Sequence, residues 1–362
     1  MESLGLTMFG NIYSGRRVLV TGHTGFKGSW LCLWLQRLGA HVSGLSLDPD
    51  TAPSHWSLLA LDGVTDQRVD LRDAHKVCAV LDDIQPEIVF HLAAQPLVRR
   101  SYREPLVTFD TNVIGLAHLL EGIRHTPSVR ALVNATTDKV YAEKDRPAGY
   151  TESDPLGGHD PYSTSKACAE LVSECYRKSF FRGGPRIATA RAGNVIGGGD
   201  WADERLIPDI VRAVTSGQSL QVRNPDAVRP WQHVLEPLAG YLRIGQMLWQ
   251  DGRSAEGAWN LGPHSQANLP VKRLVELSQS IWPGFTVEAA LGEHPHEASI
   301  LLLDSSRAAD ALGWHSVWDA HRTVERTMRW YRRYYESGEV SSADDLAAYV
   351  DDALRGSLSW AA

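Results

Sequence analysis

The chain has 362 residues, of which 43% are hydrophobic and 22% charged, so it can bury a large core. At roughly 150 residues per domain, it has room for two domains. Its formal net charge of −7 argues against a nucleic-acid partner, because such proteins concentrate Lys and Arg against the phosphate backbone.

The sequence also gives no sign of membrane insertion. The N-terminal residues lack a basic segment followed by an apolar one, and no run of about 18 apolar residues occurs. We therefore expect a cytoplasmic protein with no membrane partner. The four cysteines show neither paired spacing nor a Cys/His cluster, which predicts reduced thiols and no metal site.

The N-terminal half alternates apolar strands with helices. Residues 17–21 form a β-branched run that ends in glycines, and residues 26–38 carry apolar side chains at helical spacing. Further strands are predicted over residues 41–47, 88–93 and 131–135. This alternation predicts an α/β fold of the Rossmann type, with a doubly wound parallel sheet covered by helices on both faces.

The rhythm breaks after about residue 191, where prolines and tryptophans become frequent. We predict a Rossmann domain over residues 1–190, to which segments near 232–263 return, and a smaller mixed α/β substrate-binding domain over residues 191–340. The ligand cleft is expected at the carboxyl ends of the strands. Residues 341–362 begin like a capped helix and are expected to form a peripheral C-terminal tail.

A glycine-rich turn joins the first strand to the first helix. Residues 21–28 read Thr-Gly-His-Thr-Gly-Phe-Lys-Gly, which is a dinucleotide-binding pattern in the strand-turn-helix context that it requires. The glycines let backbone N–H groups approach a pyrophosphate at the helix N-terminus. An ordinary glycine turn is the alternative, and the βα units that follow favour the cofactor.

The residue that should bind the adenosine ribose departs from the usual pattern. The second strand is expected to end at Ser46 instead of an acid, with Asp48 two residues further on. No arginine follows nearby to hold a 2'-phosphate, so we expect NAD and not NADP. Asp70 is a candidate for binding the adenine amino group and equally well a helix N-cap.

Tyr162 and Lys166 lie four residues apart on one face of a helix that Pro161 can begin. A lysine ammonium and a cofactor cation beside a tyrosine stabilise its phenolate, which then serves as a base. With the glycine turn and Thr137, this pair resembles the extended short-chain dehydrogenase/reductase family.

The resemblance extends to the sugar-nucleotide 4,6-dehydratases through residues 134–141, Asn-Ala-Thr-Thr-Asp-Lys-Val-Tyr. The pair Asp138–Lys139 is similar to the CDP-glucose 4,6-dehydratases, and residues 22–28, 91–99, 191–201, 229–234 and 294–298 agree with them. The usual Ser-Asp-Lys-Cys of that group is Thr-Asp-Lys-Val here. The resemblance implies a lyase that uses NAD to convert CDP-glucose to CDP-4-keto-6-deoxyglucose.

The same resemblance implies the roles of the site residues. Tyr162 deprotonates the C4 hydroxyl, Thr137 binds the C4 oxygen, Asp138 protonates the departing C6 hydroxyl, and Lys139 removes the C5 proton directly or through water. A surface ion pair or a turn is the alternative for Asp138 and Lys139, because neighbours on a regular strand point to opposite faces. The implied cofactor contacts are Gly22, Gly25, Phe26, Gly28, Asp70, Leu71, Ala93, Ala94 and Lys166, and the implied substrate contacts are Asn112, Asn194, Arg229, Arg191 and His296.

Several alternatives stay open. Asn112 could orient the active-site lysine or begin a helix, and Arg191 could form a structural ion pair instead of binding a diphosphate. His294, His296 and Glu297 lack a third well-spaced metal ligand and are interpreted as pocket-lining or structural. Another nucleotide-sugar dehydratase, an epimerase and a non-catalytic NAD-binding regulator are the other function classes. The resemblance implies a homodimer or homotetramer, with residues 106–124 and 162–181 as candidate interface helices.

Overall fold

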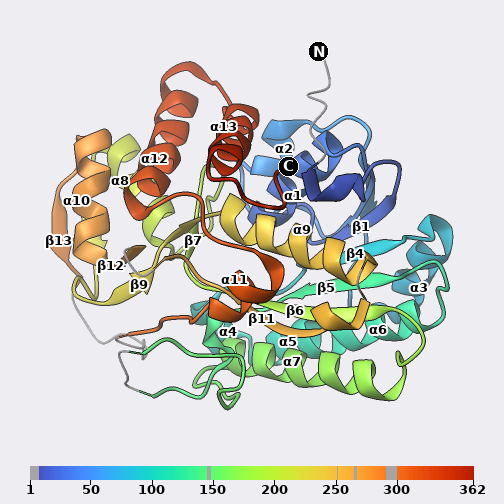
Figure 1. Ribbon diagram of the computed structural model, residues 1–362. Coiled ribbons are helices and arrows are strands. Elements are labelled where there is room, and N and C mark those ends of the chain that lie inside the picture. Colours follow the sequence, from blue (N-terminus) through green and yellow to red (C-terminus); the bar gives the residue numbers. More distant parts are fainter. Residues whose placement is uncertain (1–7, 145–147, 251, 265–266, 291–299) are drawn as a thin grey trace.

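The computed structural model describes residues 8–144, 148–250, 252–264, 267–290 and 300–362. Within these ranges a seven-stranded sheet has the strand order β11-β6-β5-β4-β1-β2-β3, and every neighbouring pair is parallel (Figure 1). The predicted doubly wound α/β fold is therefore confirmed. The strands are β1 (Arg17–Thr21), β2 (His41–Ser46), β3 (Thr65–Arg68), β4 (Ile88–His91), β5 (Ala131–Ala135), β6 (Arg186–Ala192) and β11 (Gly257–Leu261).

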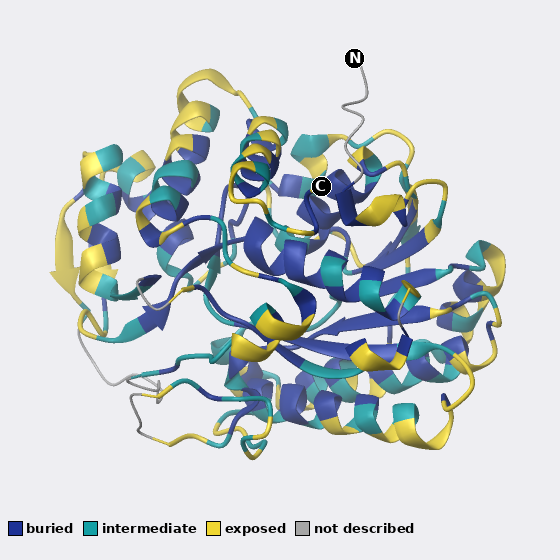
Figure 2. Cartoon of the chain, in the orientation of Figure 1, coloured by how far each residue is buried: buried dark blue, intermediate teal, exposed yellow. Residues whose placement is uncertain are grey.

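Helices cover both faces of the sheet. Val18 and Val20 of β1 pack into one core with α1 and α9, whereas Leu19 packs into a second core with α3, α6 and α7. Alternate side chains of a strand point to opposite faces, so both faces are apolar and buried (Figure 2). The covering helices are α1 (Phe26–Arg37), α3 (Ala74–Ile84), α6 (Gly115–Arg124), α7 (Pro161–Ser179) and α9 (Leu235–Gln250).

A further hydrophobic core, rich in tryptophan, lies in the C-terminal half. Trp201, Trp231, Trp282 and Trp330 belong to it. It is built on short two-stranded sheets, β7–β10, β9–β12 and β8–β13. Its elements are β7 (Val195–Ile196), α8 (Leu206–Ser216), β8 (Leu220–Val222), β9 (Val228–Pro230), β10 (Gln232–His233), β12 (Asn268–Pro270), α10 (Val271–Ile281), β13 (Val287–Ala289) and α12 (Ala320–Ser337).

Between these cores the chain crosses more than once. After β10 it returns to the main sheet through α9 and β11, and the domain boundaries near residues 190 and 340 stay predictions. The short connecting elements are η1 (Met8–Asn11), α2 (His55–Leu59), α4 (Val98–Arg103), α5 (Pro105–Phe109), η2 (Asp110–Ile114), η3 (Asp138–Val140), η4 (Gly252–Ala255) and α11 (Ser306–Leu312).

The C-terminal tail is not peripheral, contrary to the expectation from sequence. Helix α13 (Ser342–Arg355) buries Leu346, Tyr349, Val350 and Ala353 in the core that contains β1 and α1, at the spacing of one helical face. Beyond the helix, Trp360 has 0% of its surface exposed and stacks on Phe9 with ring centroids 5.1 Å apart. The capped helix start predicts the helix, but the expectation of a peripheral tail left out this apolar face.

A buried carboxylate also fixes the C-terminal helix. Glu236 at the start of α9 accepts hydrogen bonds from the Trp318 amide at 2.7 Å and the Tyr349 hydroxyl at 2.7 Å. The Val317 amide donates to the same carboxylate. Buried polar groups are costly unless they are paired, and here the donors come from two segments distant in sequence. The network therefore joins α9 to α13.

We expect Trp360→Ala to lower the free energy of unfolding by about 3–5 kcal/mol, because it empties a fully buried aromatic site. Denaturant titration followed by circular dichroism measures this loss. Phe180→Ala removes a half-exposed aromatic and serves as the control, with an expected loss of about 1 kcal/mol or less. Equal losses of unfolding free energy in the two variants would indicate that the C-terminal tail is peripheral.

Candidate active site

The glycine turn brings two backbone segments into close contact. Gly22 has φ of +73°, and a Cβ there would lie 2.7 Å from the amide nitrogen of Ala93 after β4. A Cβ on Gly28 would lie 2.1 Å from the Gly22 carbonyl oxygen. Gly25 caps α1 without a side-chain hydrogen bond, which leaves the first-turn N–H groups facing outward. This cradle fits a dinucleotide pyrophosphate.

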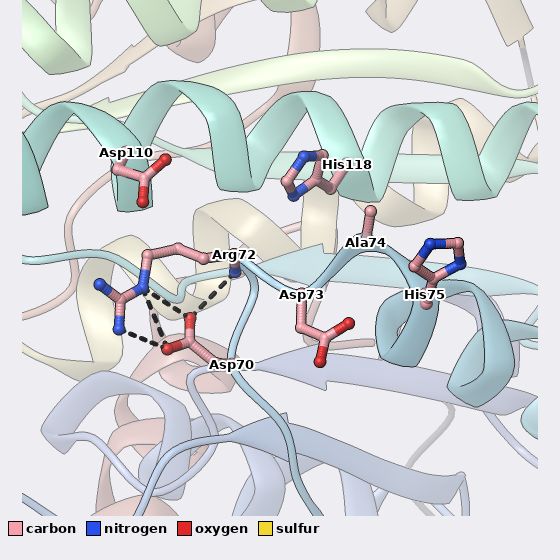
Figure 3. A pocket seen from close by; sticks show the side chains of 7 residues that line it. All are labelled: Asp70, Arg72, Asp73, Ala74, His75, Asp110 and His118. Atoms are coloured by element: carbon pink, nitrogen blue, oxygen red, sulfur yellow. Dashed lines mark hydrogen bonds and ion pairs between the residues drawn. The ribbon is translucent and has the colours of Figure 1, made fainter.

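The loop after β3 forms the wall of a surface hollow of about 630 Å³. The Asp70 carboxylate holds the Arg72 side chain at 2.6–3.1 Å, while Asp110 and His118 lie across from them (Figure 3). Arg72 lowers the pKa of Asp70.

Asp73, not Asp70, caps α3 by accepting from the Lys76 amide, so the N-cap alternative for Asp70 is wrong. Leu71 is buried next to it.

Helix α7 places Tyr162 and Lys166 at the carboxyl end of β5. Pro161 is the first helical residue, and Asp160 and Ser163 form a capping box that fixes the start. The Lys166 ammonium donates to the Ala135 carbonyl at 3.1 Å. Burial raises the pKa of Tyr162 to about 12 and lowers the pKa of Lys166 to about 8.

Strand β5 ends before the Thr137–Lys139 segment, which turns into the short helix η3. Residues 138 and 139 are thus free of the alternation that would send them to opposite faces. Asp138 is only 2% exposed, and Oδ1 accepts from the Thr137 hydroxyl at 3.0 Å. Oδ2 has no partner among the described residues, and burial raises the carboxyl pKa. Thr137 also lies close enough to Tyr162 to lower its pKa, so these side chains share one site.

The structure adds basic residues that the sequence analysis did not assign. The Lys27 ammonium lies 3.5 Å from the Tyr241 hydroxyl, and burial lowers its pKa to about 8, helped by the nearby charges of Arg205 and Lys166. Arg205 precedes α8, pairs with Asp200 at 2.9 Å and lies close enough to Tyr162 to influence its pKa. Lys27 falls inside the glycine motif, so only its position in that motif could have indicated it.

The residues expected to bind the substrate have different surroundings in the structure. Arg229 on β9 is buried, and its charge lowers the pKa of Asp138 against the effect of burial. Asn194 occupies the turn between β6 and β7, where its carbonyl accepts from the Gln232 amide. Asn112 hydrogen-bonds the Gln95 backbone and the Ser165 hydroxyl, and neither bond involves Lys166. His296, with His294 and Glu297, lies outside the described residues.

Arg191 forms the structural ion pair that the sequence left open. Its guanidinium donates to both oxygens of Glu170 at 2.9 Å, and both side chains are buried. It also donates to the Tyr141 hydroxyl at 2.8 Å. Thr136 and Thr189 donate to the same carboxylate, so β5, β6 and α7 are tied together next to the Thr137–Lys139 segment. These contacts explain the burial of the Arg191 side chain without a bound ligand.

The expectation that no arginine lies near the end of β2 is wrong. Strand β2 does end at Ser46, but the parallel register with β3 places Arg68 beside it. This arginine could not be found from the sequence, because β3, with the polar sequence Thr-Asp-Gln-Arg, carries no apolar signal of a strand. Among the described residues, no group of three or more His, Cys, Asp and Glu side chains is placed to hold a metal ion.

Comparison with known proteins identifies the family. The family model for GDP-mannose 4,6 dehydratase matches residues 19–327. The chain belongs to this family. The CDP-glucose 4,6-dehydratase of Salmonella typhimurium is 44% identical over 355 residues, covering 95% of this chain and 99% of the relative. A dTDP-glucose 4,6-dehydratase of Xanthomonas campestris is 26% identical and covers 86% and 92% of the two chains.

Solved structures show the same fold. The epimerase Mth375 of Methanothermobacter thermautotrophicus superposes with a TM-score of 0.81 at 23% identity, covering 91% of this chain and 95% of that one. A dTDP-glucose 4,6-dehydratase of Streptomyces venezuelae, solved as a double mutant with NAD bound, gives a TM-score of 0.74 at 26% identity over 88% and 98% of the chains. The resemblance to sugar-nucleotide dehydratases is therefore confirmed.

We expect Arg191→Met to lower the free energy of unfolding by about 3–5 kcal/mol, because it leaves Glu170 buried without its charge partner. Arg177→Met is the matched control: it breaks an ion pair with Glu174 on the surface of α7, and about 1 kcal/mol or less is expected. Thermal and denaturant unfolding measure both. A small loss together with a raised Michaelis constant for the sugar nucleotide would instead place Arg191 on the substrate.

Proposed function

We propose that this protein is a CDP-glucose 4,6-dehydratase that uses tightly held NAD. The observation that carries the proposal is Asp138: a buried carboxyl with one oxygen unpartnered among the described residues, in the same site as Tyr162 and Lys166. An acid of this kind is what the departure of a sugar hydroxyl requires. The 44% identity to the Salmonella typhimurium enzyme supports the choice of reaction and of CDP-glucose.

The residues that would hold NAD follow from the glycine cradle. The N–H groups at the start of α1, around Gly25, Phe26 and Gly28, face its pyrophosphate, and Gly22 permits the close approach. Asp70 and Leu71 would lie at the adenine, with Ala93 and Ala94 beneath the dinucleotide. When bound, NAD supplies the hydride acceptor and donor that link oxidation at C4 to reduction at C6.

Tyr162 takes the proton of the C4 hydroxyl. Burial alone opposes this by raising the pKa of the phenol to about 12, so the phenolate needs positive charge close by. Arg205 lowers that pKa directly, and Lys166 stands one helical turn along α7 from the phenol. Thr137 lies close enough to the phenol to lower its pKa, and it would hold the C4 oxygen.

Elimination then proceeds across C5 and C6. The C4 ketone acidifies the C5 proton, which Lys139 removes directly or through water. Asp138, whose pKa is raised by burial, gives its proton to the C6 oxygen, so the C6–O bond breaks and water leaves. Arg229 and Asn194 are proposed at the diphosphate, where a guanidinium and an amide offer donors to the phosphate oxygens. Asn112 would act indirectly, by fixing the loop at Gln95 to α7.

Incubation with CDP-glucose tests the proposal. Mass analysis of the wild-type reaction should show a sugar nucleotide lighter by one water, with no net consumption of NAD. Lys139→Ala should slow the loss of water by roughly 100-fold or more, the scale of a removed general base. Lys144→Ala removes a nearby, half-exposed lysine and is the control, with an unchanged rate.

The outcomes separate the alternatives. Loss of water from dTDP-, GDP- or UDP-glucose but not from CDP-glucose would indicate another dehydratase, and inversion at C4 without loss of water would indicate an epimerase. Intact sugar in every case would favour a non-catalytic NAD-binding regulator. Equal dehydration by the wild type and Lys139→Ala would remove that lysine from the mechanism.

We further propose a cytoplasmic homodimer, whether or not dimers pair again into tetramers. Leu106 on α5 is 82% exposed and Leu171 on α7 is 59% exposed, and Tyr102 and Ile114 add exposed apolar surface nearby. Helices α5 and α7 pack against each other, so these side chains lie on adjacent helices.

The four cysteines are free thiols, which is typical of a reducing compartment. None of the helices in the described ranges has the length and apolar character needed to cross a bilayer.

Sedimentation velocity should give a dimer or a multiple of it, and Leu106→Glu combined with Leu171→Glu should shift the protein to monomer, because charge is then buried in the interface. Val287→Glu on β13 replaces an apolar residue that is 44% exposed and far along the chain, and we expect it to leave the assembly intact. A monomeric wild type would contradict the proposed interface.

A further inference from the structure

The adenosine end of the cofactor site lacks its usual acid. In this fold a carboxylate at the end of the second strand binds the ribose hydroxyls, whereas an arginine accommodates a 2'-phosphate. Here Ser46 ends β2, and its hydroxyl is 2.8 Å from the Thr24 hydroxyl, inside the glycine turn. Ser46 is buried by this contact, so the position offers no carboxylate to a ribose.

An arginine from the neighbouring strand lies at this position instead. The Arg68 guanidinium donates to the Leu47 carbonyl at 2.9 Å and to Asp66 Oδ2 at 2.6 Å. Asp48 Oδ1 lies 3.6 Å from the same guanidinium. The Arg68 side chain is about one-third exposed, so it is anchored at the strand ends while part of it still faces the surface.

Asp66 links this arginine to the glycine turn. Its second oxygen, Oδ1, lies 2.9 Å from Nε2 of His23, a fully buried residue of the turn. The His23 ring fills the space above Gly44, where a Cβ would lie 2.2 Å from it. His23, Asp66 and Arg68 therefore form one chain of contacts from the pyrophosphate cradle to the end of β2.

We propose that Arg68 and Asp66 together determine the preference of this protein for NAD over NADP. Arg68 meets the adenosine ribose in place of the missing acid and donates to its 2'-oxygen. Asp66 holds the guanidinium in an ion pair, so that its charge is already balanced and a 2'-phosphate gains little. The inference rests on the proposed dinucleotide cofactor and not on the identity of the sugar.

Fluorescence titration of cofactor-free protein with NADH and NADPH tests this directly. Asp66→Asn keeps an oxygen that can accept from His23 but removes the closest charge partner of Arg68, so affinity for NADPH relative to NADH should rise about tenfold or more. Arg68→Ala should weaken NADH binding several-fold, and the double variant should lose the gain for NADPH. Asp62→Asn removes an exposed carboxylate ahead of β3 and controls for the change in net charge.

The outcomes distinguish this inference from the proposed function. A wild type that binds neither dinucleotide would overturn both. A wild type that binds NADH while Arg68→Ala binds it equally well, or while Asp66→Asn gains nothing for NADPH, would overturn the inference alone. A gain for NADPH that survives in the double variant would also overturn it, because Arg68 would then not be the group responsible. Dehydration of CDP-glucose by wild-type protein with NAD remains a separate readout.

Discussion

The exclusion of water from the carboxyl ends of the parallel strands is the constraint on which the site depends. Burial raises the pKa values of Tyr162 and Asp138 and lowers those of Lys166 and Lys27. All four shifts favour the neutral form, because a charge costs more in a desolvated site. A neutral carboxyl suits an acid, but a neutral phenol is a poor base. The same burial thus favours the proposed protonation of the C6 oxygen by Asp138. The proposed deprotonation of the C4 hydroxyl by Tyr162 instead requires nearby cations.

The architecture supplies those cations from separate parts of the chain. Lys27 comes from the glycine turn, Lys166 from α7, Arg205 from the start of α8 and Arg229 from β9. Parallel strands bring their carboxyl ends to one edge, and Arg205 and Arg229 lie close enough to that edge to influence the pKa values of Tyr162 and Asp138. The paired Arg191 and Glu170, although charged, serve instead to fix the strands and helix that carry the proposed catalytic residues.

The sequence was most informative where local pattern determines structure. Strands β1 and β5 have the predicted bounds because each is a short apolar run, and the start of α7 follows from Pro161 and its cap. Contacts across the sheet were not predictable in this way. Arg68 reaches Ser46 only through the register of β3, a polar edge strand, and Lys27 reaches Tyr241 only through the packing of α9. The family motifs pointed to the site, but not to these neighbours.

The contact between Phe9 and Trp360 has a consequence for how the protein is made. The Phe9 amide donates to the Trp360 carbonyl at 2.7 Å, so segments near the two ends of the chain complete a single core around α1. Trp34 of that helix packs on both aromatic rings. During synthesis, the glycine turn and first helix leave the ribosome with this surface uncovered, and it stays so until residue 360 has followed. The part of the protein that holds the glycine turn is therefore made early but gains its final stability late.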